Sequence, residues 1–441
     1  MSAATLFPRP SDVEASTPPD RDRAIDVIRI TALLAVVVGH TVMATSIIRD
    51  DVFIWSNLLT ASPMFQALTW LFQIMPLFFF AGVAASVQSW TPGSSWGNWL
   101  MRRCTRLYRP VFYYLAFWAV TLVALKLLLP VHVYEPVAGI STQLLWFLGA
   151  YVLVLAAIPA LARITTTGRF VVAVVTAYTL VAVVDAIRIN LDVWPLFGYL
   201  NLSMWLIPGM LGVAYRRRLL SPRAALIAGA AMFAVNAALV AFGPYELSLV
   251  GIETQHLKNM SPPSLLLAGH AIMMCTLAIA AAPLITQWAR RPRVWWLTVI
   301  GNSGAMTLYL WHIPLLLGMH LLFDYLGYPR FPDAPHFVAL SVLQLATMTL
   351  AVGVAFVVLR PLENDPLPFW DGGFVARPGL RSAAVGSLLC VAGAATLGSV
   401  GWGLKDLGLY LTAAMVTALI TARRLAVQDL SDVRDEFGFR A

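Results

Sequence analysis

The chain has 441 residues, of which 59% are hydrophobic and 12% are charged, and its mean hydropathy is +0.76. A soluble domain carries about a quarter charged residues, so this composition excludes an ordinary soluble protein. The formal charge of +8 could indicate a nucleic-acid partner, but the distribution of that charge, described below, argues against one.

Long uncharged stretches recur from Ile30 almost to the C-terminus, which predicts an all-α, polytopic integral membrane protein. Twelve charge-poor runs are long enough to cross a bilayer. They lie at residues 27–48, 65–88, 109–130, 142–161, 169–187, 195–215, 224–242, 264–287, 302–323, 337–359, 382–400 and 404–422.

The segments outside these runs set the domain boundaries that we predict. Residues 1–22 are polar and rich in proline and serine, which predicts a disordered cytoplasmic tail. We expect no cleavable signal peptide, because the first apolar run is long and starts late. The main transmembrane domain is predicted at 23–365, followed by a cytoplasmic linker at 366–381, two additional helices at 382–422 and a cytoplasmic tail at 423–441.

The positive charges gather in alternate connections between the predicted spans. If the N-terminus is cytoplasmic, that side of the membrane has 24 of the 30 Lys and Arg residues and the opposite side has five. The positive-inside rule describes this asymmetry, so the basic balance indicates topology, with both termini cytoplasmic. Arginine outnumbers lysine 27 to 3, a bias that suggests a bacterium of high GC content and therefore its plasma membrane.

The three cysteines are Cys104, Cys275 and Cys390, which lie far apart beside or within apolar segments. Their spacing indicates neither a disulfide framework nor a metal site. We therefore predict no bound metal.

The first span, RAIDVIRITALLAVVVGHT at residues 23–41, carries ionisable side chains that are costly inside a membrane. Arg29 and His40 are eleven helical steps apart, which places them on one face at about 16 Å from each other. Asp26 is one turn before Arg29 and can pair with it. A low dielectric favours neutral histidine, so His40 could accept a proton or simply bond a neighbouring helix.

A second cluster is MRRCTRLYRP at residues 101–110, just before the third span. Arg103, Arg106 and Arg109 repeat every three residues, so on a helix they form a short basic stripe. Such a stripe suits bidentate phosphate binding. The alternative is ordinary topological arginine beside anionic lipid.

A third stretch is VWWLTVIGNSGAMTLYLWHIPLLL at residues 294–317. Its paired tryptophans are typical of a membrane interface, and a polar Gly-Asn-Ser turn follows, in which Asn302 or Ser303 can cap a new helix. Tyr309 and His312 are one turn apart and share a face. A second intramembrane histidine after a polar turn indicates a polar cavity shared with the first span.

These segments resemble the acyltransferase-3 family of multi-pass bacterial enzymes, which O-acylate glycans, lipids and other acceptors. AIDVIRITALLAVVVGH is similar to that family's first span, with Asp-x-x-Arg followed by ten residues and a histidine. The matching residues are Asp26, Arg29 and His40. RCTRLYRP at residues 103–110 resembles the family's Arg-x-x-Arg loop leading into tyrosine and proline.

The likeness extends in order from about residue 20 to residue 365. Further matching segments are LLWFLGAYVL at 144–153, IGNSGAMTLYLWHIP at 300–314 and RPLE at 360–363. PLFFFAGV at 76–83 resembles a family turn, but Ala81 replaces the usual serine, so we assign no role there. The last two spans lie beyond the family core.

The resemblance implies a ten-helix acyltransferase-like bundle with two extra C-terminal helices, and the activity of an O-acyltransferase. It implies His40 as the general base or acyl carrier, acting toward a hydroxyl of a cell-envelope glycan, lipid or related acceptor. Acyl-CoA would be the co-substrate, with no cofactor bound permanently, and membrane lipids rather than nucleic acid would surround the protein. Arg103 and Arg106 would hold the CoA phosphates; Asp26 and Arg29 would orient the first span or bind the donor; Tyr108, Ser303, Tyr309 and His312 would line the cavity.

Two other classes of function stay open at this point. A secondary transporter also has about twelve spans and ionisable residues near the midplane, although no repeat relates the first six spans to the last six. It would need no acyl-CoA. An acyltransferase-like scaffold would bind a partner without releasing free CoA. We rank the enzyme first and the transporter second.

Overall fold

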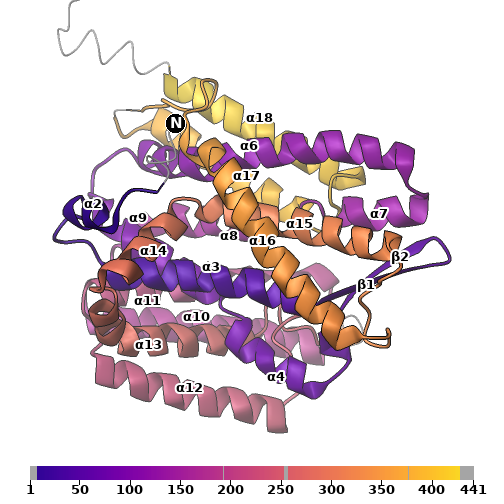
Figure 1. Ribbon diagram of the computed structural model, residues 1–441. Helices are drawn as coiled ribbons and strands as arrows, with labels where there is room; N and C mark the ends of the chain where they lie inside the picture. The colour runs from indigo at the N-terminus through magenta and orange to yellow at the C-terminus, as the bar shows by residue number, and fades with distance from the viewer. Residues whose placement is uncertain (1–6, 192, 253–256, 376, 428–441) are drawn as a thin grey trace, which may run out of the picture. The chain divides into compact units, whose positions relative to one another are not determined.

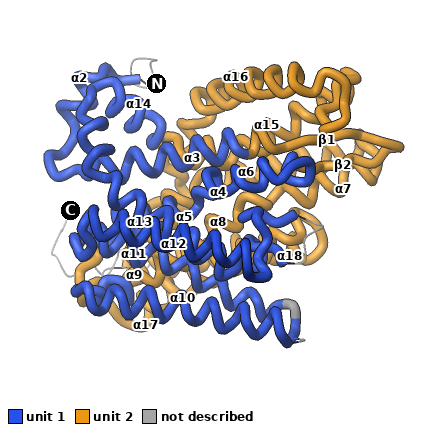
Figure 2. The backbone as a smooth tube through the Cα atoms, turned by 90° about the horizontal axis from the view of Figure 1, so that it is seen from below, with its two compact units in different colours: residues 1–39, 58–89, 160–303 blue, residues 40–57, 90–159, 304–441 orange. Residues whose placement is uncertain are grey.

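The structure is a computed structural model that describes residues 7–191, 193–252, 257–375 and 377–427. The chain divides into two compact units, which Figure 2 distinguishes by colour. Helix α3 (Arg23–Met43) begins in the first unit and ends in the second. Unit 1 comprises residues 1–39, 58–89 and 160–303, and unit 2 comprises residues 40–57, 90–159 and 304–441.

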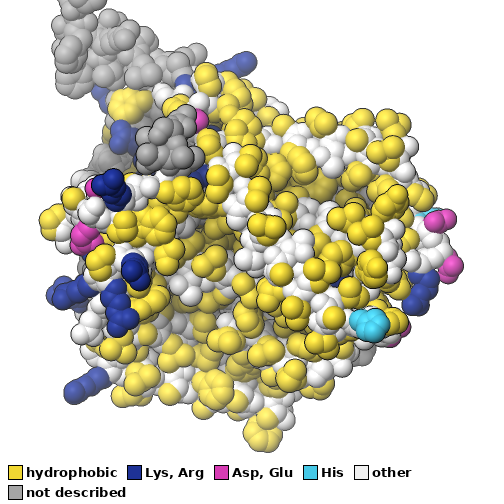
Figure 3. All heavy atoms as spheres, viewed as in Figure 1, with side chains coloured by type: hydrophobic (Ala, Val, Ile, Leu, Met, Phe, Trp, Pro, Cys, Tyr) yellow, Lys and Arg dark blue, Asp and Glu magenta, His cyan; other side chains and the backbone are white. Residues whose placement is uncertain are grey.

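Twelve helices in the described ranges are long and apolar enough to cross a membrane. This confirms the predicted all-α polytopic membrane protein, because only helices and closed barrels satisfy their backbone hydrogen bonds within lipid. Figure 3 shows hydrophobic side chains over most of the visible face, with Lys and Arg gathered where helices of unit 1 end. Such an apolar surface suits lipid and would be unfavourable in water.

Unit 1 is organised around α13 (Leu265–Trp288), which packs against α5, α10, α11 and α12 (Figure 1). The helix is mostly buried, and its buried residues are mainly apolar. The other elements of unit 1 are α2 (Pro10–Ala15), η1 (Leu58–Thr60), α4 (Pro63–Phe72), α5 (Met75–Ser86), η2 (Val87–Ser89), α9 (Ile158–Leu161, from residue 160), α10 (Thr167–Asn190), η3 (Pro195–Trp205), α11 (Leu206–Arg216), α12 (Pro222–Phe242) and α14 (Pro292–Asn302).

Unit 2 contains the longest helix, α6 (Trp96–Leu128), and both additional C-terminal helices. Helix α17 (Leu380–Ser399) packs against α6, α8 and α18. Gly149 of α8 meets Gly393 of α17 so closely that a Cβ atom at Gly149 would lie 2.5 Å from the Gly393 carbonyl oxygen. Small residues allow this close helix packing within membranes. The other elements are β1 (Ala44–Arg49), β2 (Val52–Asn57), α7 (Val131–Ile140), α8 (Leu145–Ala156), α15 (Ala305–Tyr325), α16 (Phe337–Asn364) and α18 (Asp406–Val427).

The segment predicted as a linker, residues 366–381, is packed into unit 2 over its described residues. Trp370 is fully buried, and its indole Nε1 donates a hydrogen bond to the Thr105 carbonyl of α6 at 2.9 Å. Arg423 of α18 donates to the Trp370 carbonyl at 2.7 Å. The two additional helices and the segment before them are therefore bound to α6 rather than attached loosely.

The N-terminal segment is ordered over residues 7–22, so the prediction of a disordered tail is wrong there; residues 1–6 lie outside the described ranges. Trp296 donates to the Pro8 carbonyl at 2.6 Å and Trp295 donates to the Thr17 hydroxyl at 2.7 Å. These indoles belong to α14. The polar segment folds because distant tryptophans supply its partners, which local composition does not reveal. Residues 428–441 of the predicted C-terminal tail also lie outside the described ranges.

The first helix ends earlier than predicted, at Met43 rather than near residue 48. The chain then forms an antiparallel hairpin in which β1 pairs with β2, from Ala44 opposite Asn57 to Arg49 opposite Val52. Asp50 and Asp51 form its two-residue turn with φ of 52° and 59°, the left-handed backbone of a type I′ turn. The β-branched and aromatic residues of these strands explain why the apolar run does not continue as a helix.

The close contact of α8 with α17 can be tested by Gly149→Ala. The new methyl group would press on the Gly393 carbonyl, and overpacking of this kind costs about 1–3 kcal/mol. We expect a lower melting temperature of the purified protein in detergent. Gly353→Ala in α16 is the matched control, because nothing lies within 4 Å of a Cβ atom there. Equal melting temperatures for the two variants would contradict the packing described.

Candidate functional site

His40 and His312 contact each other within unit 2. His40 Nδ1 lies 2.9 Å from His312 Nε2, and the two rings lie edge to edge, with centroids 5.2 Å apart and 11° between their planes. The structure thus brings together the histidine predicted to carry the chemistry and one predicted to line its cavity. The two residues come from α3 and α15, 272 residues apart in the sequence.

The hydrogen bonds of this pair determine where its protons lie. His312 Nδ1 is 3.1 Å from the Leu308 carbonyl oxygen, which can only accept, so Nδ1 carries the proton. A neutral His312 then has a bare Nε2, and His40 must donate to it from Nδ1. A neutral His40 is therefore left with an unprotonated Nε2. Such a nitrogen can accept a proton or attack an electrophile.

His40 is an exposed residue, whereas His312 is 1% exposed. The apolar residues exposed on the same helix are Leu34, Val38 and Val42. Helical geometry places His40 about 160–240° around the axis from these three. His40 therefore lies on a different face of α3 from the apolar stripe that suits lipid.

Tyr309 lies one turn before His312, and their ring centroids are 6.2 Å apart. Its hydroxyl donates to the carbonyl of Leu144 at 2.5 Å, just before α8 begins. The side chain is 3% exposed. Tyr309 therefore packs beside His312, and its hydroxyl connects α15 to the residue before α8 by a hydrogen bond to a backbone carbonyl.

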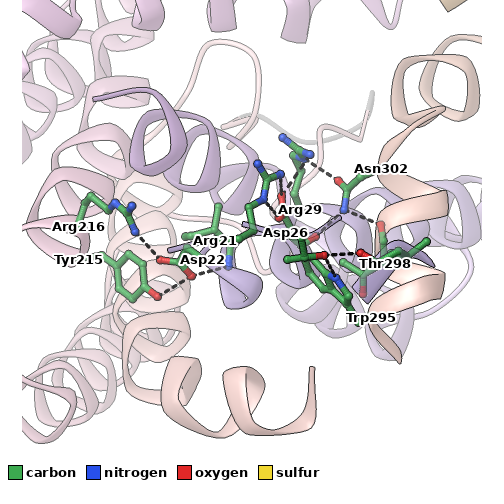
Figure 4. A network of polar contacts seen from close by, with 12 residues as sticks. Arg21, Asp22, Asp26, Arg29, Tyr215, Arg216, Trp295, Thr298 and Asn302 are labelled. Carbon is green, nitrogen blue, oxygen red and sulfur yellow. Dashed lines mark hydrogen bonds and ion pairs between the residues drawn. The ribbon is translucent and has the colours of Figure 1, made fainter. Parts of the chain in front are cut away.

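The first two turns of α3 carry a polar network within unit 1, which Figure 4 shows. Arg29 Nε donates to Asn302 Oδ1 at 2.7 Å, and Arg29 Nη2 lies 3.5 Å from Asp26 Oδ1. The predicted pairing of Asp26 with Arg29 forms, but Asp26 has a closer partner in Arg21, at 2.6 Å. The Asp26 hydrogen bond raises the pKa of the Arg21 guanidinium. Because Asp26 also binds Arg21, the charge of Arg29, one-third exposed, is only partly compensated.

Arg109, the third arginine of the predicted basic stripe, holds the fold together. Its Nε and Nη2 bind the carboxylate of Asp371, and its Nη1 donates to the carbonyls of Glu363 and Asn364 at 2.9 and 3.0 Å. These contacts use four of the five N–H groups of the guanidinium. Arg109 therefore connects α6 to the end of α16 and to the segment that follows.

Arg103 and Arg106 differ from Arg109 in their surroundings. The guanidinium of Arg103 lies over the Trp99 ring, 3.5 Å from its centroid, and its Nη1 donates to the Trp99 carbonyl at 3.0 Å. Arg106, one turn further along α6, is exposed. An oriented guanidinium beside an exposed one gives a surface to which a phosphate can bind.

Two other predicted cavity residues make contacts between and within helices. Tyr108 is fully buried, and its hydroxyl lies 3.4 Å from Thr396 Oγ1 of α17. Ser303 belongs to unit 1, and its hydroxyl donates to the Ile300 carbonyl at 2.6 Å. Their nearest hydrogen-bonding contacts therefore stabilise the fold.

Glu363, in the RPLE segment, has a role that sequence reasoning missed. Its Oε2 accepts hydrogen bonds at 2.9 Å from both the backbone N–H and the hydroxyl of Thr307, in the first turn of α15. A carboxylate at this end of a helix offsets the unpaired N–H groups and the helix dipole. The predicted cap by Asn302 or Ser303 is wrong, because the N-cap residue is Gly304 and makes no side-chain cap.

The described ranges contain no group of three or more His, Cys, Asp or Glu residues that could hold a metal ion. The three cysteines are free thiols. The histidine pair offers proton transfer or nucleophilic attack by His40 Nε2.

Comparison with known proteins shows the family of the chain. The model of the acyltransferase-3 family, described as an acyltransferase domain, matches residues 22–360. This range includes α3 with both Arg29 and His40, the arginines of α6, and all of α15. No curated protein and no solved structure matches the chain.

Proposed function

The chain belongs to the acyltransferase-3 family and is a multi-pass membrane acyltransferase, and on this premise we propose its reaction. It transfers a short acyl group from cytoplasmic acyl-CoA to a hydroxyl of a cell-envelope glycan, lipid or related acceptor. One observation carries the proposal. His40 is an exposed residue whose Nε2 is unprotonated, because its proton is on Nδ1, which donates a hydrogen bond to His312 Nε2.

In the proposed reaction, His40 Nε2 removes the proton from the acceptor hydroxyl as the hydroxyl oxygen attacks the thioester carbonyl carbon. The new C–O bond forms and the C–S bond breaks. The CoA thiolate takes the proton from His40 and leaves as free CoA, so atoms and charge balance. His312 would stabilise the transient imidazolium by accepting from Nδ1 throughout, the role of an orienting partner to a base.

A second order of events uses the same lone pair. His40 Nε2 would attack the thioester directly, CoA would leave, and the acceptor hydroxyl would then take the acyl group from the histidine. In this order CoA leaves as the thiolate and takes its proton from water, and the acceptor hydroxyl later releases its proton to water as the acyl group moves from His40 Nε2 to its oxygen, so atoms and charge balance. An acceptor-independent burst of CoA release is expected only for the second order.

Arg103 and Arg106 are proposed to bind the CoA phosphates. The stacking of Arg103 on Trp99 fixes the direction of its guanidinium, and the exposed Arg106 adds a second positive charge one turn away. Arginine suits phosphate because its N–H groups can bind two oxygens at once. Arg29 is a further candidate for the donor, since its partly exposed guanidinium is held by Asn302.

Two features of the sequence support a donor and an acceptor that arrive from opposite faces of the bacterial plasma membrane. Most Lys and Arg residues lie on the side predicted to be cytoplasmic, where acyl-CoA is made. His40 lies toward the opposite end of α3, three residues before its end at Met43. The transporter alternative is disfavoured, because family membership assigns acyl transfer to the chain.

Replacing His40 tests the proposed base. His40→Ala should lower acyl transfer by about 10²- to 10⁴-fold, the usual contribution of a general base, with unchanged membrane insertion. The measurement is CoA thiol release from a panel of acyl-CoAs by purified protein, with mass analysis of the cell envelope. His132→Ala, at an exposed histidine of α7, is the matched control. Wild-type transfer by His40→Ala would remove this residue from the mechanism.

Replacing the two arginines tests the donor site. Arg103→Ala combined with Arg106→Ala should weaken acyl-CoA binding by at least tenfold at low salt and by less at high salt, because salt screens exposed charges. The measurement is a binding titration at two ionic strengths. Arg223→Ala, which removes an exposed charge from α12, should leave the affinity unchanged. Equal affinities for wild type and the double variant would restrict these arginines to topology.

A further inference from the structure

The terminal turn of α3 is held by two buried side chains from the other end of the sequence. We propose that Arg330 and Gln344 are positioning residues, which bind carbonyls at the end of α3 and so keep His40 hydrogen-bonded to His312. The inference rests on the proposed function, since it concerns the same base. Neither residue falls in a segment that the sequence analysis singled out.

The contacts of these two residues converge on the end of α3, within unit 2. Arg330 donates from Nη2 to the Val42 carbonyl at 2.9 Å and from Nη1 to the Ala44 carbonyl. Gln344 donates from Nε2 to the Thr41 carbonyl. The last four carbonyls of a helix have no partner within it. Side chains therefore bind the carbonyls of Thr41 and Val42 in the last turn of α3 and that of Ala44, the first residue of β1.

The charge of Arg330 is compensated in an unusual way. The residue is 2% exposed, and in the described part of the chain no carboxylate forms an ion pair with it. Its charge faces the carbonyl end of α3, which carries the negative pole of the helix dipole. Burial lowers the pKa of Arg330 to about 10, which leaves the guanidinium protonated at neutral pH. The helix end and the guanidinium thus stabilise each other.

The position of His40 explains why this matters. His40 is in the last turn of α3, directly before the first of the bound carbonyls, at Thr41. Helix ends fray when their backbone groups lack partners. Fraying here would rotate the ring of His40 away from His312 and change which nitrogen is protonated. A displacement of about 1 Å in a catalytic group can cost about 100-fold in rate.

Gln344→Leu is the sharpest variant for this test. Leucine keeps the volume but removes the N–H that binds Thr41. It also removes Gln344 Oε1, a buried atom without a hydrogen-bond partner in the described structure, so folding should lose little. We expect kcat to fall about 10- to 100-fold while KM for acyl-CoA changes less than about twofold, since donor contacts remain.

Arg330 provides a second, independent test. Arg330→Met should lower kcat at least as much as Gln344→Leu, and Arg330→Lys should recover part of the rate, because its ammonium restores the charge but binds fewer carbonyls. Ser341→Ala is the matched control. The Ser341 hydroxyl accepts from Arg330 Nε at 3.2 Å and touches no carbonyl of α3, so its loss should leave kcat unchanged.

A double-mutant cycle separates positioning from general stability. If Gln344 acts by keeping His40 hydrogen-bonded to His312, then Gln344→Leu should have little further effect in a His312→Ala background. A purely structural role would lower the rate by the same factor in both backgrounds. Melting temperatures and the monodisperse fraction of each variant are measured in parallel.

The outcomes distinguish this inference from the proposed function. An active wild-type protein, an inactive His40→Ala and a non-additive cycle would support both. Wild-type rates in Gln344→Leu and Arg330→Met, or additive losses in the cycle, would overturn the inference alone. Absence of acyl transfer by the wild-type protein from any acyl-CoA in the panel would overturn the proposed function, and the inference with it.

Discussion

The hydrogen bond from His40 Nδ1 to His312 Nε2 is the interaction on which the site depends. It forms because the Leu308 carbonyl accepts a hydrogen bond from His312 Nδ1, where the one proton of a neutral His312 ring therefore lies. His312 Nε2 is then unprotonated and can accept a hydrogen bond from His40. The two histidines are then both neutral, and each donates a hydrogen bond from Nδ1 in a defined direction. A neutral pair is less costly in a low-dielectric environment than a buried ion pair. Without this bond, His40 would be one more polar side chain on an apolar helix.

The rest of the structure holds the two helices that form this bond. The beginning of α15 is capped by Glu363, whose neighbouring backbone is in turn bound by Arg109. The end of α3 is bound by Arg330 and Gln344. These side chains satisfy helix termini, where backbone groups lack partners. The sequence suggests several charged residues as substrate ligands or as topological signals. In the structure some of them, such as Arg109, bind helix ends, whereas others, such as Arg106, stay exposed.

The sequence predicts the membrane spans and points to the two histidines, because both predictions depend on the free energy of placing a short segment in lipid. A long apolar run must be a helix in lipid, and an ionisable residue inside it needs a reason to be there. What the sequence does not predict is partner choice across long separations. Arg109 looks like Arg103 in its segment, yet the carboxylate partner of Arg109 is Asp371, 262 residues away. Arg330 stands in a polar loop, and the disorder expected for residues 7–22 fails because Trp295 and Trp296 bind that segment.

Nitrogen-15 NMR of the histidine-labelled protein, with signals assigned through His40→Ala and His312→Ala, tests the central claim most directly. The chemical shift of an imidazole nitrogen reports whether it carries a proton. The account predicts that both rings are neutral and protonated at Nδ1, with His40 Nε2 bare. A proton on His40 Nε2, or a doubly protonated ring at neutral pH, would contradict it.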